Sequence, residues 1–305
     1  MGEIVEHTFA EDGVRRVTLP LPTGPRHVHC YVVGGTLFDT GLGLDAPAWG
    51  ELGIERIAIT HFHPDHVGGA ETASAESGAT VFQGALDYAQ CERVWGSSDW
   101  PERIADWFVA HGVPQPIAHE LLDQGHAFAP FIRFAPDPDL LYEGSELDGW
   151  QVLDLPGHAD GHVGFLRDGV LLGGDHLLAR ITPAVGLYHE SRPDPLGDYL
   201  ASLERTIELA PRIVYPGHGE PITNAAHRAR EIVQHHHTRL DQVAAALASG
   251  PRSGFAVSLD VFGAELSRQQ RRFAVAETLS HLERLVFDGR ARRDGSADAV
   301  TYTGP

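Results

Sequence analysis

The stretch Thr60-His61-Phe62-His63-Pro64-Asp65-His66 decides the fold of this 305-residue chain. It places three imidazoles and one carboxylate close together, directly after the apolar run Ile57–Ile59. The apolar run predicts a buried strand, with the polar side chains on the loop at its carboxyl end. One tetrahedral ion does not easily use all four groups, so the spacing predicts two metal ions side by side. The stretch contains no cysteine, which favours a catalytic metal site over a closed structural one.

Strand-like runs precede further residues of ligand type. These residues are Asp39, His158, Asp175 and His218. Glycines beside them permit sharp backbone turns next to a crowded site. The strand ends therefore predict a metal-lined cleft at one edge of a layered sheet. The alternative for the histidine-rich stretch alone is a surface loop.

The motifs, taken in order, resemble the metallo-β-lactamase superfamily over about residues 15 to 222. The resemblance implies an α+β fold, an αββα sandwich, with two divalent metal ions per chain. The implied ligands are His61, His63 and His158 for a first ion, Asp65, His66 and His218 for a second, and Asp175 between the two. Asp39 matches a family position that usually holds the ligand loop in place without touching metal. Zinc is the expected metal, although iron or manganese would fit the same ligands.

The metal site predicts hydrolysis, because paired divalent ions make hydroxide available near neutral pH. Asp65 is the expected orienting base, and His162 is a candidate proton relay. For His162 and His176, the alternative is an ordinary hydrogen-bonded histidine. The candidates for substrate selection, all in the loop after Asp175, are Tyr188, His189 and Arg192.

Composition excludes several classes of function. All 23 basic residues are arginines, so lysine nucleophiles and Schiff bases are excluded. Residues 1–224 carry 12 arginines against 33 acidic residues, a formal charge of −21, and such a surface is a poor partner for nucleic acid. No apolar run reaches about 18 residues, so no membrane span is expected. Two cysteines and no apparent secretion signal predict a cytoplasmic protein.

The pattern divides the chain into a catalytic domain, residues 1–223, and a C-terminal domain, residues 224–305. The second domain is expected to contain a long helix, a shorter element, a second helix at about 271–287 and a polar hairpin, the order of a winged-helix-like module. We expect it to pack on the catalytic domain or to form a homodimer rather than to bind DNA. The run His235-His236-His237 is predicted to lie on solvated helix surface, because neighbouring helical residues point about 100° apart.

The expected substrate is a small molecule, an acyl thioester of coenzyme A, a carrier protein or a related compound. The alternatives are a lactone hydrolase and a metal-dependent (ribo)nuclease, with a ligand-sensing DNA-binding protein as a remote third. The glutathione-binding helical domain of glyoxalase II is not apparent, which favours carriers other than glutathione. The aromatic-rich residues 88–132 form either an apolar lid over the cleft or a satellite core under a helical insertion.

Overall fold

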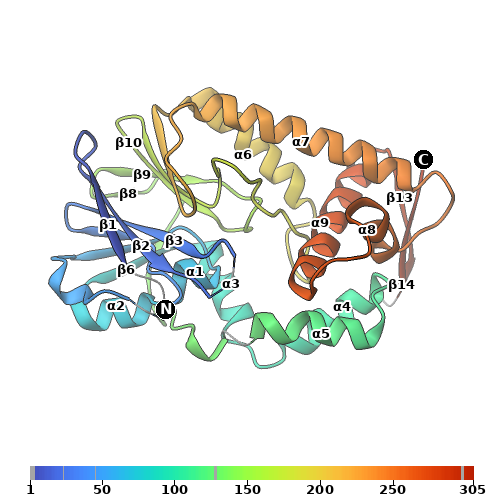
Figure 1. Ribbon diagram of the computed structural model, residues 1–305, viewed down its shortest axis with the longest axis horizontal. Helices are drawn as coiled ribbons and strands as arrows, with labels where there is room; N and C mark the ends of the chain where they lie inside the picture. Colours follow the sequence, from blue (N-terminus) through green and yellow to red (C-terminus); the bar gives the residue numbers. More distant parts are fainter. Residues whose placement is uncertain (1–3, 23, 45, 127–128, 297–298) are drawn as a thin grey trace.

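The computed structural model describes residues 4–22, 24–44, 46–126, 129–296 and 299–305. Its two main β-sheets stack against each other, with helices on their outer faces (Figure 1). The first sheet has the order β1 (Val5–Phe9), β2 (Val14–Pro20), β3 (His27–Val33), β4 (Thr36–Phe38), β5 (Arg56–Ile59), β6 (Thr80–Gly84) and β7 (Asp139–Leu141). The second sheet has the order β12 (Ile213–Pro216), β11 (Val170–Gly174), β10 (Val163–Arg167), β9 (Trp150–Asp154) and β8 (Glu146–Leu147). The expected αββα sandwich is confirmed.

Helices cover both outer faces and build the C-terminal part. Those of the first half are η1 (Trp49–Glu51), α1 (Pro64–Val67), α2 (Ala70–Ser77), α3 (Ala85–Val94), α4 (Trp100–Ala110), α5 (Gln115–His126) and η2 (Ala129–Phe131). Those of the second half are α6 (Pro195–Leu209), α7 (Ala225–Ala246), α8 (Gly254–Phe262) and α9 (Arg268–Phe287), followed by the hairpin β13 (Arg292–Ser296) and β14 (Ala299–Thr303). No helix of the described ranges is both long and apolar enough to cross a bilayer.

The alternation of side chains along the strands produces the layers. In β3, Cys30 packs toward the helices on the outer face, whereas Tyr31 packs toward the second sheet. Between the sheets, the Phe38 ring lies 5.0 Å from the Phe165 ring and 5.4 Å from the Trp150 ring, measured between centroids. Both faces of the central strands are thus apolar, and only their ends are free to carry polar side chains.

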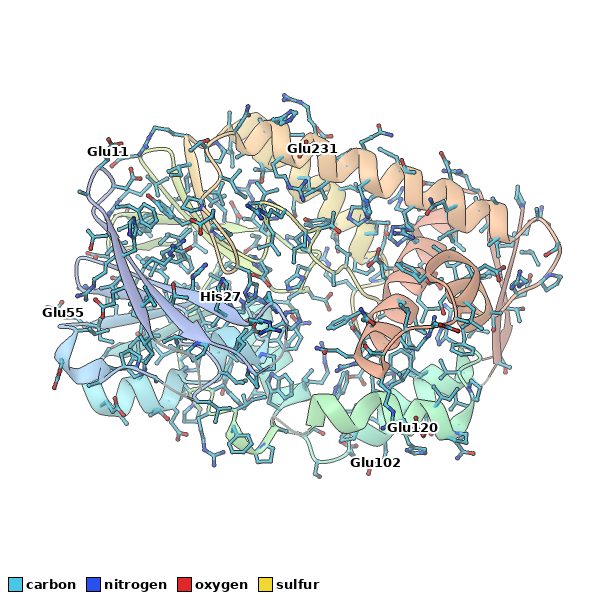
Figure 2. The ribbon with its side chains drawn as sticks, in the orientation of Figure 1. Glu11, His27, Glu55, Glu102, Glu120 and Glu231 are labelled. Carbon is cyan, nitrogen blue, oxygen red and sulfur yellow. The ribbon has the colours of Figure 1, made fainter. Side chains whose placement is uncertain are left out.

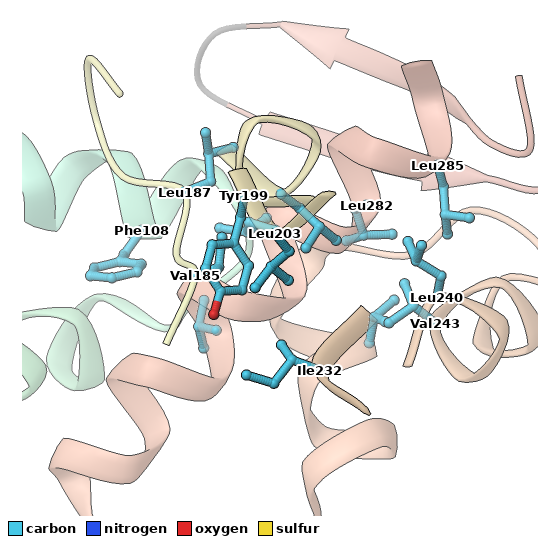
Figure 3. Close-up of a cluster of buried hydrophobic side chains, with 14 of the residues drawn as sticks. Phe108, Val185, Leu187, Tyr199, Leu203, Ile232, Leu240, Val243, Leu282 and Leu285 are labelled. Carbon is cyan, nitrogen blue, oxygen red and sulfur yellow. The ribbon is translucent and has the colours of Figure 1, made fainter. Parts of the chain in front are cut away.

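A shared apolar core joins the sandwich to the C-terminal helices. Tyr199 and Leu203 of α6 pack with Ile232 and Leu240 of α7 and with Leu282 of α9 (Figure 3). The predicted domain boundary falls directly before α7, inside the region that this core spans. The C-terminal part is therefore fixed against the second sheet by burial of apolar surface.

The aromatic-rich residues 88–132 are partly core. Trp100 is 6% exposed and Phe108 is fully buried, and both belong to the core that contains α6 and α9. Phe131, by contrast, is 48% exposed. Residues 127 and 128 lie outside the described residues. The satellite-core interpretation therefore holds for Trp100 and Phe108.

The prediction of a solvated histidine run was wrong for His236, which is 1% exposed. Its spacing from Ile232 and Leu240 places it on the buried face of α7, since residues four apart share a helix face. Its Nδ1 lies 3.2 Å from Nε2 of His281, whose own Nδ1 donates to the carbonyl of Glu277 at 2.7 Å. Two neutral imidazoles satisfy this chain of hydrogen bonds.

This pair predicts a loss of stability in acid. Burial and the neighbouring imidazole lower the pKa of His236 to about 2, and burial lowers that of His281 to about 4. Because the unfolded chain protonates near pH 6.5, folding stability is lost as the pH falls below that value, by about 2 kcal/mol per histidine at pH 5. Urea unfolding of His236→Phe should show a shallower pH dependence than the wild type. Replacement of the exposed neighbour, His237→Phe, should leave the slope unchanged.

Candidate metal centre

The predicted ligands converge at the carboxyl ends of four strands. Three overlapping sets have ligand atoms within 4.8 Å of one another: His61 with His63 and His158, His61 with His66 and Asp175, and Asp65 with His66 and His218. The strands that deliver them are β5, β9, β11 and β12. All seven predicted ligands are therefore brought together from four separate segments of the chain.

Two of these side chains lie on a helix rather than on the expected loop. Pro64 begins α1, and Asp65 and His66 belong to its single turn, with His63 as the N-cap. Proline favours the first helical turn because its missing N–H has no intrahelical partner there. The turn follows His61 and His63 in the chain, and His66 on it still lies close enough to His61 to share one of the three sets.

Asp39 holds histidines of both positions. Its Oδ1 accepts from the Thr60 backbone N–H at 2.8 Å, and its Oδ2 accepts from the Thr60 hydroxyl and from Nδ1 of His66, each at 2.8 Å. The Thr60 hydroxyl oxygen in turn lies 3.0 Å from Nδ1 of His61. Asp39 has a φ of 61°, a left-handed conformation that aspartate tolerates better than most residues. Asp39 therefore contacts His66 directly and His61 through Thr60, and its role in holding a ligand loop stays a prediction.

Backbone carbonyls orient two further histidines. Nδ1 of His158 donates to the carbonyl of Ala184 at 2.7 Å, and Nδ1 of His218 donates to that of His27 at 2.8 Å. His27, labelled in Figure 2, begins β3; its side chain is exposed, and it contributes its backbone carbonyl here. Because a carbonyl only accepts, Nδ1 carries a proton, and Nε2 is the nitrogen that has a lone pair when the ring is neutral. Such a partner is typical of metal-binding histidines.

Several inward-facing atoms are buried with no hydrogen-bond partner among the described residues: Nε2 of His66, Nε2 of His158 and Oδ1 of Asp175. Buried polar atoms without partners are uncommon because they are costly. Here they converge, and imidazole nitrogen with carboxylate oxygen suits zinc and similar divalent cations. The residues therefore fit metal ions.

Asp175 lies between the two halves of the site. Its Oδ1 is 3.6 Å from Nε2 of His66, and its Oδ2 is 3.6 Å from Nε2 of His158 and 3.3 Å from Nε2 of His218. Burial lowers the pKa of His218, but the carboxylates of Asp175 and Asp65 outweigh it and raise that pKa to about 10. A cation bound here would replace the proton on His218 as the partner of these carboxylates.

His162 and His176 lie behind the ligands. His162 is 1% exposed, its ring stacks on His61 with centroids 4.8 Å apart, and its Nε2 accepts from the backbone N–H of Asp175 at 3.2 Å. His176 is fully buried, with Nε2 2.7 Å from the hydroxyl of Thr206 in α6. Both side chains therefore contact protein rather than open space.

The three substrate candidates have different surroundings. The guanidinium of Arg192 donates two hydrogen bonds, of 2.6 and 3.1 Å, to the carboxylate of Asp198. These bonds leave fewer of its N–H groups for a substrate. The His189 ring lies 6.0 Å from that of Trp100. The guanidinium carbon of Arg272 lies over the ring of Tyr188, 5.7 Å from the ring centroid. Their roles in substrate selection stay predictions.

Sequence reasoning missed three side chains of the helix α3 region that hold the ligand loops: Asp87, Gln90 and Trp95. Their spacing matches no metal or catalytic motif. Gln90 and Trp95 also fall within residues 88–132, which aromatic content marked as lid or core. The only local signal was an acidic residue in the first turn of a helix, which is ordinary.

Comparison with known proteins agrees with this geometry. The family described as "Metallo-beta-lactamase superfamily" matches residues 23–218, and "Metallo-beta-lactamase-like, C-terminal domain" matches residues 240–302. The probable metallo-hydrolase YqjP of Bacillus subtilis is 31% identical over 245 residues, 75% of this chain and 74% of that protein. The crystal structure of the metallo-beta-lactamase family protein TTHA1429 from Thermus thermophilus superposes with a TM-score of 0.84 at 34% identity, covering 96% of this chain and 99% of that one.

Two more distant relatives have names that state a reaction. Atrochrysone carboxyl ACP thioesterase of Passalora fulva is 27% identical over 229 residues, 64% of this chain and 66% of that protein. A hydroxyacylglutathione hydrolase of Alkalilimnicola ehrlichii is 30% identical over 173 residues, 57% of this chain and 50% of that protein. Both names describe enzymes that act on thioesters.

The hydrogen bonds of Asp39 yield a test of the centre. Asp39→Asn keeps a residue suited to the left-handed conformation but replaces one acceptor oxygen with an NH₂ group. We expect zinc affinity to fall by roughly 10- to 100-fold, because His61 and His66 lose their common anchor. Competition with a coloured chelator measures this. Asp168→Asn, another aspartate with positive φ (50°), is the matched control and should bind zinc normally.

Proposed function

The chain belongs to the metallo-beta-lactamase superfamily, and from that premise we propose that it is a dinuclear metal-dependent hydrolase of acyl thioesters. The observation that carries the dinuclear part is the position of Asp175, whose carboxylate lies within 3.6 Å of Nε2 of His158, in one proposed ligand group, and of Nε2 of His66 and His218, in the other. A single ion would leave one of these groups of buried ligand atoms without a partner.

The proposed ligands divide into two groups around Asp175. The first position would be held by His61, His63 and His158, and the second by Asp65, His66 and His218. When bound, zinc or a similar ion supplies Lewis acidity toward the thioester carbonyl and makes hydroxide available near neutral pH. The net reaction adds water across the C–S bond and releases a carboxylic acid and a thiol.

We assign the orienting role to Asp65. Its side chain is 23% exposed, against 10% for Asp175 and 8% for His218, so it faces the open side of the centre. Burial raises its pKa, but the imidazoles of His66 and His218 outweigh that effect and hold the pKa at about 2. An ionised carboxylate here accepts a hydrogen bond from the attacking water and can take its proton.

We assign a supporting role to His162. Its ring contacts His61, and its Nε2 accepts from the Asp175 backbone, so its polar groups face the ligands from behind. With 1% exposure it has little access to a leaving group. We therefore propose that it holds the ligand loops in place instead of relaying a proton.

The choice of thioester is supported by two observations. Relatives of this chain carry the names of a carrier-protein thioesterase and of a hydroxyacylglutathione hydrolase. The formal charge of −19 also disfavours a polynucleotide, whose phosphates need many basic contacts. Coenzyme A and carrier-protein thioesters are therefore the first substrates to test, ahead of lactones and RNA.

Thiol release from a panel of acyl thioesters tests the proposal. Zinc-loaded wild type should release thiol, and Asp65→Asn should lower kcat by at least about 100-fold because the orienting carboxylate is lost. Asp106→Asn, the same substitution on the exposed side of α4, should leave kcat unchanged. If no acyl chain is cleaved although two metals are bound per chain, the thioester assignment is wrong.

A further inference from the structure

Side chains from the helix α3 region hold the residue between two proposed ligands. Phe62 separates His61 from His63. Its backbone N–H donates to Oδ1 of Asp87 at 2.9 Å, and its carbonyl accepts from Nε1 of Trp95, the C-cap of α3, at 2.8 Å. Both polar backbone groups of Phe62 are therefore bound to one structural element, which limits rotation of this peptide segment.

The same helix reaches the loop that carries the third ligand of this position. Oε1 of Gln90 accepts from the backbone N–H of Gly161 at 3.1 Å, three residues after His158. Gly161 also packs directly on α3, where a Cβ at this position would lie 2.2 Å from the backbone nitrogen of Asp87. Only glycine allows the loop to approach the helix this closely.

These supporting side chains are themselves fixed. Asp87 is fully buried and Gln90 is 5% exposed. The second oxygen of Asp87 accepts from Nε2 of Gln83 at 2.6 Å, so both carboxyl oxygens have partners. Burial also raises the pKa of Asp87 well above its usual value. Burying a carboxyl group costs free energy unless its oxygens have hydrogen-bond partners, and here both oxygens of Asp87 have one.

The proposed second metal position is held differently. Its His66 donates to Asp39, its His218 donates to the carbonyl of His27, and its Asp65 lies on α1. Among the described residues, the hydrogen bonds from Asp87, Gln90 and Trp95 to the ligand loops go to Phe62 and Gly161, beside ligands of the first position. Asp39 is shared by the two positions, because it also reaches His61 through Thr60.

We propose that Asp87, Gln90 and Trp95 are positioning residues that set the metal affinity of the His61–His63–His158 position independently of the second position. This inference rests on the ligand assignment of the proposed function. It requires that changes in α3 alter one metal affinity and leave the other nearly unchanged.

Variants that lack a ligand of one metal position allow the zinc affinity of the other position to be measured by itself. His218→Ala removes a ligand of the second position, and His63→Ala removes one of the first. Into each background we would introduce Asp87→Leu, which removes two hydrogen bonds, or Gln90→Met or Trp95→Phe, which remove one each. Zinc affinity is measured by chelator competition, and folding by circular dichroism melts.

The expected result is a zinc affinity at least tenfold weaker in the His218→Ala background and changed by less than about threefold in the His63→Ala background. Asp87→Asn keeps an oxygen that can accept from Phe62 and should restore most of the affinity. Val94→Ala truncates a partly buried apolar side chain on the same helix and should lower the melting temperature without weakening zinc binding in either background.

Equal weakening in both backgrounds, no weakening in either, or weakening by Val94→Ala as large as that by Asp87→Leu would overturn the inference. Each of these results would show that α3 contributes only general stability. A wild type that binds zinc but cleaves no thioester would instead contradict the proposed reaction and leave the role of α3 intact. The two failures are therefore distinguishable.

Discussion

The centre depends on how the protein fixes the protons of its histidines. One ring nitrogen of His61, His66, His158 and His218 lies against an oxygen acceptor, respectively the Thr60 hydroxyl, Asp39 and the carbonyls of Ala184 and His27. In the neutral ring, each acceptor selects a tautomer and leaves the opposite nitrogen with a lone pair. The inward-facing nitrogens are thus oriented as candidate metal ligands by groups on the other side of each ring.

The sandwich supplies these supports because its strands end at one edge. Candidate ligands as distant in sequence as His61 and His218 lie close together at this edge. The strands that carry them, β5, β11 and β12, are held in position by apolar residues packed on both of their faces. Helices then brace the loops from outside, with α1 carrying part of the motif and α3 contacting two ligand loops. The apolar core that α6, α7 and α9 share fixes the second sheet from the other side. The geometry of the site is therefore a property of the entire fold.

Sequence reasoning recovered what local pattern encodes. The spacing in residues 60–66 and the polar residues after apolar runs predicted both the layered sheet and the convergence of the ligands. Residues that act through distant contacts were missed: Asp87 meets Phe62 only because α3 folds back under the loop, and no motif marks it. His236 was misplaced, although its spacing from Ile232 and Leu240 carried the correct signal. Contacts between elements, rather than periodicity within them, contained the missing information.

The central claim is that two metal ions share Asp175, and anomalous diffraction from crystals of the zinc-loaded protein tests it most directly. Data collected on both sides of the zinc absorption edge locate each ion without reference to activity. The account predicts two anomalous peaks, one among His61, His63 and His158 and one among Asp65, His66 and His218, with a carboxylate oxygen of Asp175 reaching each. A single peak at full zinc loading, or two peaks of which only one contacts Asp175, would contradict it.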